Sequence, residues 1–159
     1  MEKMILITQD DEVKELEYPQ KDDWEQLKKY IGNECRLMQH VQPVRLYTEI
    51  GAGHVINRHE PGEKVSMMVD EEFLFNPKAK LNKIASYLYK TDIHGDVILG
   101  NVLIVGEKYE NEKISLCGLS DKQFHIIFPQ LKKIEEHLKK EGRVWEEKDF
   151  QENRFYKLI

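Results

Sequence analysis

The stretch of sequence that decides the fold is residues 67–106, MMVDEEFLFNPKAKLNKIASYLYKTDIHGDVILGNVLIVG. A short apolar run over 65–69 predicts a strand that leads into an acidic turn at 70–72. The β-branched run over 96–105 predicts a central strand that is buried on both faces of a sheet. Gly100 inside this run indicates a bulge or a close approach of another backbone. The stretch therefore predicts the centre of one compact domain.

Three helices are predicted from capping residues and apolar spacing. Asn76 followed by Pro77 predicts a helix start, because Asn caps free N–H groups and the fixed φ of proline suits the first helical position. A second helix is predicted over 23–32, which ends in glycine. A third is predicted over 120–142, where a Ser-x-x-Gln capping box opens it. Pro129 inside this last helix predicts a kink or a second start.

Extended segments supply the rest of the predicted sheet. Residues 4–18 form a short apolar run and a second, more polar extended segment around a polar turn, which is typical of a β-hairpin. Residues 35–41 and 44–47 are predicted as strands, with a break or a sheet edge at Pro43. We expect a single α+β domain over 1–159: a mixed, mainly antiparallel sheet with two to three helices packed on one face.

Composition narrows the class of protein. The chain has 159 residues, 24 basic and 29 acidic side chains and a formal net charge of -5, which does not favour a nucleic-acid binder. Its apolar runs are shorter than the ~20 residues that span a bilayer, and its first residues do not resemble a signal peptide. We therefore expect a cytoplasmic protein. Cys35 and Cys117 form no C-x-x-C pair, which indicates two reduced, partly buried thiols.

Several segments resemble a family of proteins from bacteriophages, conjugative elements and their bacterial hosts, catalogued as domain of unknown function 3846. The resemblance covers about residues 4–135 and is carried by Val69-Asp70-Glu71-Glu72, Leu81-Asn82-x-x-Ala85-Ser86 and Asp96-Val97-Ile98-x-Gly100-Asn101-x-Leu103-Ile104-Val105-Gly106. It implies a mobile-element protein that counteracts host defence, and it implies no enzyme chemistry. The segment 41–64 is longer than in the family, and the tail 143–159 has no counterpart there. Both segments are candidates for a partner surface.

Candidate catalytic and metal-binding residues are few. His54, His59 and Glu60 offer two imidazoles and a carboxylate, but a solvated loop explains them as well as a metal site does. His94-Gly95-Asp96 is either an acid/base pair or a turn. The acidic residues 70–72 lack the further oxygen donors of a cation loop. We therefore predict no catalytic set, no resident metal and no cofactor.

Candidate ligand-binding residues lie in the middle of the chain. Phosphate recognition favours Arg, and Arg36, Arg45 and Arg58 are the arginines before the tail. Tyr47 could stack on a base, and Asn57 adjoins Arg58 in the variable segment. Together they would suit a protein that sequesters a nucleotide immune signal, with its pocket at the interface of a homo-oligomer.

Two further groups are candidates for contact with a partner. Asn82 and Lys83 lie on the flank of the predicted central helix, where Asn82 either binds a ligand or ties the helix to the sheet. Trp145 and Arg154 lie in an aromatic and basic tail whose composition is typical of binding hot spots, although packing against the core explains it equally.

The function that these observations favour is binding. We expect a phage or mobile-element accessory protein that inhibits a bacterial defence protein by binding it. The alternatives are a sponge for a nucleotide signal and, with less support, a metal-assisted hydrolase that uses His54, His59 and Glu60.

Overall fold

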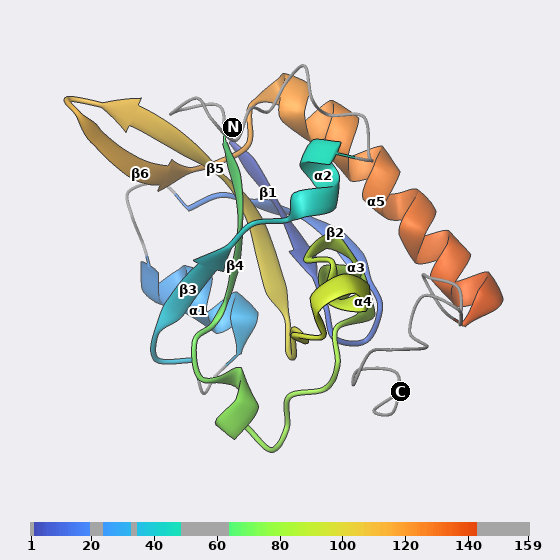
Figure 1. Cartoon of the computed structure of the whole chain (residues 1–159). Coiled ribbons are helices and arrows are strands. Elements are labelled where there is room, and N and C mark those ends of the chain that lie inside the picture. Colours follow the sequence, from blue (N-terminus) through green and yellow to red (C-terminus); the bar gives the residue numbers. More distant parts are fainter. Residues whose placement is uncertain (1, 20–23, 33–34, 49–63, 143–159) are drawn as a thin grey trace.

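The described residues form a six-stranded sheet in which every strand pairing is antiparallel. The computed structural model in Figure 1 describes residues 2–19, 24–32, 35–48 and 64–142. The strand order is β2-β1-β5-β4-β3, and β6 pairs with the outer half of β5. The strands are β1 (Lys3–Ile7), β2 (Val13–Glu17), β3 (Met38–Val41), β4 (Val65–Asp70), β5 (Val102–Glu110) and β6 (Lys113–Cys117). The prediction of an α+β fold is confirmed.

Helices cover both faces of this sheet. The face that carries Ile5, Met67 and Ile104 packs against the α2 (Val44–Thr48), α3 (Lys83–Leu88) and α5 (Asp121–Glu141) side of the core. The opposite face, with Met4 and Leu103, packs against α1 (Trp24–Ile31). Alternate residues of β1 and β5 therefore enter two separate cores, as expected of strands buried on both faces. The packing of α1 on the second face was not part of the one-sided prediction.

The predicted strand over 44–47 is wrong, because this segment forms helix α2. The N–H of Leu46 donates to the carbonyl of Pro43 at 2.9 Å, which closes a helical turn directly after the break at Pro43. Proline's fixed φ suits the start of such a turn. The turn buries Leu46 completely and points Arg45 into the protein.

The predicted helix start at Asn76 is also wrong. Asn76 does cap free N–H groups, but it accepts a hydrogen bond from the N–H of Lys78 in a turn and not in a helix. A short 3₁₀ helix, η1 (Phe73–Phe75), precedes this turn. The helix α3 begins only at Lys83, where the side chain of Asn82 accepts a bond from the N–H of Ala85.

The central strand is shifted relative to the prediction. It begins at Val102, after Gly100 adopts a left-handed φ of 86°, and it continues to Glu110. Asn111 and Glu112 both have positive φ, as in the two-residue turns that suit a β-hairpin. The resulting β5–β6 hairpin projects from the body of the domain in Figure 1. This hairpin was not predicted.

The last helix matches its prediction at both ends. The capping box of Ser120 and Gln123 opens α5, and Gly142 closes it with a φ of 75°. The helix runs through Pro129 without a second start. A short helix, α4 (Thr91–His94), lies next to α3.

Candidate functional site

Arg45, a predicted ligand-binding residue, forms a buried ion pair. Its two terminal nitrogens donate to the two carboxylate oxygens of Asp92 at 2.6 and 2.8 Å, and one also donates to the carbonyl of Tyr87 at 2.6 Å. The guanidinium lies over the Tyr87 ring, 4.2 Å from its centroid. Because these contacts use both terminal nitrogens, Arg45 ties α2 to α3 and α4 and is not available to grip a phosphate.

Asn82 is a structural residue as well. Besides capping α3, its side-chain nitrogen donates to the carbonyls of Ile7 and Gly100 at 3.0 and 2.9 Å. The side chain is completely buried, so it cannot contact a partner in the folded protein. The structural alternative for Asn82 therefore replaces the binding role. Lys83 is half-buried at the first position of α3, and its role in binding stays a prediction.

The remaining predicted site residues are not placed by the structure. The side chain of Tyr47 lies outside the described residues, as do Asn57 and Arg58 in the variable segment and Trp145 and Arg154 in the tail. The residues of the hydrolase alternative, His54, His59 and Glu60, lie outside them too. Gly95 has a φ of 86°, which supports the turn interpretation of residues 94–96.

The acidic turn after β4 is used within the fold. One carboxylate oxygen of Asp70 accepts a hydrogen bond from the N–H of Glu72 at 2.9 Å. The carboxylate of Glu72 in turn accepts two bonds from one nitrogen of Arg36, at 3.0 and 2.9 Å. Within the described ranges, no three His, Cys, Asp or Glu side chains are placed to hold a metal ion.

A polar cluster crosses three strands on the α1 face. The hydroxyl of Ser66 on β4 donates to the Glu107 carboxylate on β5 at 2.6 Å and lies 3.3 Å from Nδ1 of His40 on β3. Because the serine proton goes to Glu107, His40 is not placed to accept it, as a nucleophile's base must. Ser66 is also buried, which closes it to a substrate. Residue spacing could not predict this cluster, because strand pairing brings its members together.

Both cysteines are free thiols, as predicted. Burial raises the pKa of Cys35 and of Cys117 to about 11. Both thiols are therefore protonated at neutral pH, and neither is activated as a nucleophile.

Two adjoining hollows lie at the end of the sheet where β4 finishes. The first has a volume of about 200 Å³ and is lined by Arg36, Asp70, Glu72, Phe75, Asn76, Pro77 and Lys78. The second, of about 140 Å³, shares Asp70, Asn76 and Lys78 with the first and extends to Gln9, Gly100 and Asn101. Arg36 and Glu72 form an ion pair at the rim of the first hollow, where the guanidinium is exposed to solvent.

Three large apolar side chains are exposed on the two segments that adjoin the first hollow, and one of them, Phe75, lines it. Leu37, just before β3, is 54% exposed, and Leu74 and Phe75 of η1 are 70% and 84% exposed. The carbonyl of Leu37 accepts a bond from the N–H of Glu71, which brings the start of β3 next to the turn that leads to η1. We call these three residues the apolar patch. The run Phe73-Leu74-Phe75 is the part of the sequence that indicates the apolar patch, because consecutive apolar residues in one short helix cannot all face the core.

The described helices do not combine the length and apolar composition needed to cross a membrane. Comparison of the chain with protein families, with curated proteins and with solved structures finds no match. The resemblance carried by residues 69–106 therefore stays a prediction.

Proposed function

We propose that this protein acts by binding, and that its target is a protein of a bacterial antiviral defence system, which it inhibits in the cytoplasm of the host cell. The observation that supports binding is the apolar patch beside the first hollow. The resemblance to a phage and mobile-element family supplies the biological part of the proposal.

The apolar patch supports a protein target on energetic grounds. Removing a leucine or phenylalanine side chain from water contributes about 1.5–3 kcal/mol. Exposed apolar groups with a polar rim are typical of protein interfaces, and arginine is enriched at their hot spots. Leu74 and Phe75 supply the apolar groups, and the Arg36–Glu72 pair supplies the charged rim.

The sponge alternative receives no comparable support from the described residues. Arg45 is held by Asp92 in the core, and Arg36 is paired with Glu72. A nucleotide phosphate would have to displace Asp92 to reach Arg45, because both terminal nitrogens of Arg45 already donate to that carboxylate.

Phage plating on bacteria that carry defined defence systems tests the proposal. The wild-type protein should restore plating of a phage that one of these systems restricts. Leu74→Glu should lose this rescue, because a carboxylate in the apolar patch would have to be desolvated in the complex. Ile93→Glu is the matched control, since Ile93 on α4 is also 70% exposed but lies outside the patch. Absence of rescue against every system, or equal loss of rescue in the two variants, would contradict the proposal.

A pull-down from the rescued cells identifies the target. The wild-type protein and Ile93→Glu should retain the same host defence protein, and Leu74→Glu should lose it. Mass spectrometry of co-purified small molecules is the complementary measurement. Capture of a nucleotide in place of a protein would favour the sponge.

A further inference from the structure

The edge strand β3 presents unpaired backbone groups beside the apolar patch. The N–H of Glu71, just after β4, donates to the carbonyl of Leu37, just before β3, so these two residues face each other as a hydrogen-bonded pair. Along an antiparallel ladder, residues whose backbone groups point toward the partner strand alternate with residues whose groups point away from it. The N–H and C=O groups of Met38 and His40 therefore point away from β4. None of the described residues bonds to these outward groups, and β3 is the last strand on its side of the described sheet.

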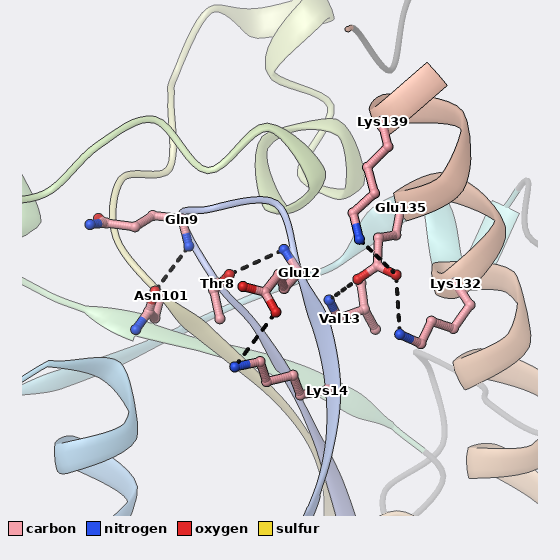
Figure 2. A network of polar contacts seen from close by, with 9 residues as sticks. All are labelled: Thr8, Gln9, Glu12, Val13, Lys14, Asn101, Lys132, Glu135 and Lys139. Carbon is pink, nitrogen blue, oxygen red and sulfur yellow. Dashed lines mark hydrogen bonds and ion pairs between the residues drawn. The ribbon is translucent and has the colours of Figure 1, made fainter. Parts of the chain in front are cut away.

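The opposite edge strand, β2, is closed by side chains. The N–H of Thr8 donates to the carbonyl of Glu12, so these two residues are a hydrogen-bonded pair of the β1–β2 ladder. The backbone groups of the next residue, Val13, therefore point away from β1, and its N–H points outward from the sheet. Figure 2 shows that this N–H is not open: it donates to the carboxylate of Glu135 on α5 at 2.5 Å. The rest of β2 carries charged side chains, which oppose the pairing of another strand. These are Lys14, Glu15 and Glu17.

The strand β3 differs from the other exposed strand edges in that it carries no charged side chains. The projecting hairpin carries exposed charges near its tip, as β2 does along its length. These are Lys108, Glu110, Glu112 and Lys113. By contrast, β3 reads Met-Gln-His-Val and contains no Asp, Glu, Lys or Arg. It is therefore the described strand edge that lacks this protection against pairing.

We propose that an extended segment of the target protein adds to β3 as a further strand and continues over the first hollow. This inference rests on the proposed function and names how the same surface holds its target. Backbone groups of Met38 and His40 bond the added strand, as in other complexes formed by strand addition. Beyond Leu37, the segment covers Leu74 and Phe75, and one of its side chains enters the hollow.

A second copy of this chain fits the edge less well than a target segment does. The strand β3 cannot extend far past Val41, because Pro43 has no backbone N–H to bond in a sheet and α2 begins at Val44. If a second copy paired through its own β3, that strand would offer four residues. That strand is too short to pair with β3 and also cover Leu74 and Phe75, which lie beyond Leu37.

The first test uses random linear peptides of about ten residues, which span about 33 Å when extended and so can cover both β3 and the hollow. Peptides are selected by display on the immobilised full-length protein, and amide hydrogen exchange is then followed by NMR with and without a selected peptide. In the free protein, the amides of Met38 and His40 should exchange fast. Bound peptide should slow both by at least about tenfold, whereas the inward amide of Gln39 should change little.

Several results would overturn the proposal. They are selection of no peptide, binding without protection of Met38 and His40, and slow exchange of these amides already in the free protein. Protection that rises with protein concentration when no peptide is present would assign the edge to a second copy instead, and would also overturn it.

A pair of proline variants tests the bonding itself. His40→Pro removes an outward N–H from β3, and Glu15→Pro removes an outward N–H from β2, so the two changes are matched. His40→Pro removes one hydrogen bond to the peptide and leaves a peptide carbonyl without a donor. This should weaken peptide binding by about tenfold. Glu15→Pro should bind as the wild type does. Equal affinity of the two variants, with both folded by circular dichroism, would contradict strand addition.

The two proposals can fail separately. If His40→Pro loses the peptides but still rescues phage plating, strand addition is wrong and target inhibition stands. If the peptides bind at β3 but no defence system is inhibited, the binding mode stands and the proposed function is wrong.

Discussion

The two outer strands of the sheet, β2 and β3, solve the same structural problem in opposite ways. An edge strand exposes backbone groups that can pair with another chain. On β2, Glu135 of α5 takes the outward N–H of Val13, and charged side chains line the rest. On β3, none of the described residues bonds to the outward groups of Met38 and His40, which adjoin the apolar patch. This contrast between the edges supports our proposal that a partner binds on the β3 side of the domain.

Each edge depends on a buried carboxylate, although the two carboxylates act differently. Glu135 contacts its edge directly, whereas Asp92 acts through Arg45, which holds α2 where the chain leaves β3. Disturbing either carboxylate should therefore disturb one side of the sheet more than the other.

The largest effect is expected on the β3 side from Arg45→Ala. Removing the guanidinium leaves Asp92 as an uncompensated buried charge, which should lower the free energy of unfolding by about 3–5 kcal/mol. Arg36→Ala is the matched control, because it breaks an exposed Arg–carboxylate pair and should cost at most about 1 kcal/mol. Urea unfolding measures both. Similar losses in the two variants would show that the Arg45–Asp92 pair is not a buried structural link.

A smaller effect is expected on the β2 side from Glu135→Ala. This change leaves the Val13 N–H without its acceptor and should cost about 2 kcal/mol. It should also open β2 and lower the protein concentration at which aggregation begins. Glu136→Ala, an exposed neighbour on the same helix, should change the free energy of unfolding by less than about 0.5 kcal/mol. Equal stability of the two variants would show that Glu135 does not stabilise the β2 edge.

The pH dependence of stability should reveal the same carboxylate. Burial by itself raises the pKa of Glu135, but the Val13 N–H and the ammonium groups of Lys132 and Lys139 outweigh burial and hold the pKa below its ordinary value of 4.5. Because the folded protein binds this proton less readily than the unfolded chain, the stabilisation is fully present well above pH 4.5 and is lost as the pH falls through the folded pKa.

Comparison of wild type with Glu135→Gln isolates this contribution. The difference between their free energies of unfolding should be constant near neutral pH and should shrink below about pH 4.5. If the difference in free energy of unfolding instead grows as the pH falls, the pKa of Glu135 is raised in the folded protein and our account of it is wrong.

The smallest effect on stability is expected from a charge placed on the open edge. Gln39 is exposed, so Gln39→Lys should change the free energy of unfolding by less than about 0.5 kcal/mol. The selected peptides should nevertheless bind several-fold more weakly, because a lysine on an edge strand opposes pairing. Lys14→Gln makes the reverse change on β2 and should gain no peptide binding, since Glu135 still occupies the Val13 N–H. Unchanged affinity in Gln39→Lys would show that lack of charge does not define the β3 edge.

What the sequence could predict was set by local signals. The capping box at Ser120 and the glycine at 142 fix α5 through contacts within one turn, so both ends were predicted correctly. Asn76 and Pro77 carry an equally strong local signal, but an Asn side chain can cap a turn as well as a helix, and here it caps a turn. Residues 44–47 were misassigned because a buried ion pair to Asp92, far along the chain, favours a helix there.

The candidate surface was harder to predict than the fold. Leu74 and Phe75 have the composition of core residues, and their exposure follows from the turn after β4. Arg45 was chosen because arginine favours phosphate, yet its partner could not be identified from spacing. The outward groups of β3 are backbone groups, so their position depends on strand order and register, which the sequence does not reveal.

The most direct test of the contrast between the edges is amide exchange of Val13 and His40 in the free protein. Both N–H groups point outward from edge strands, so their difference reports how each edge is closed. After correction for the intrinsic exchange rates, we expect Val13, bonded to Glu135, to exchange at least about tenfold more slowly than His40. Equal exchange rates, or slower exchange at His40, would contradict it.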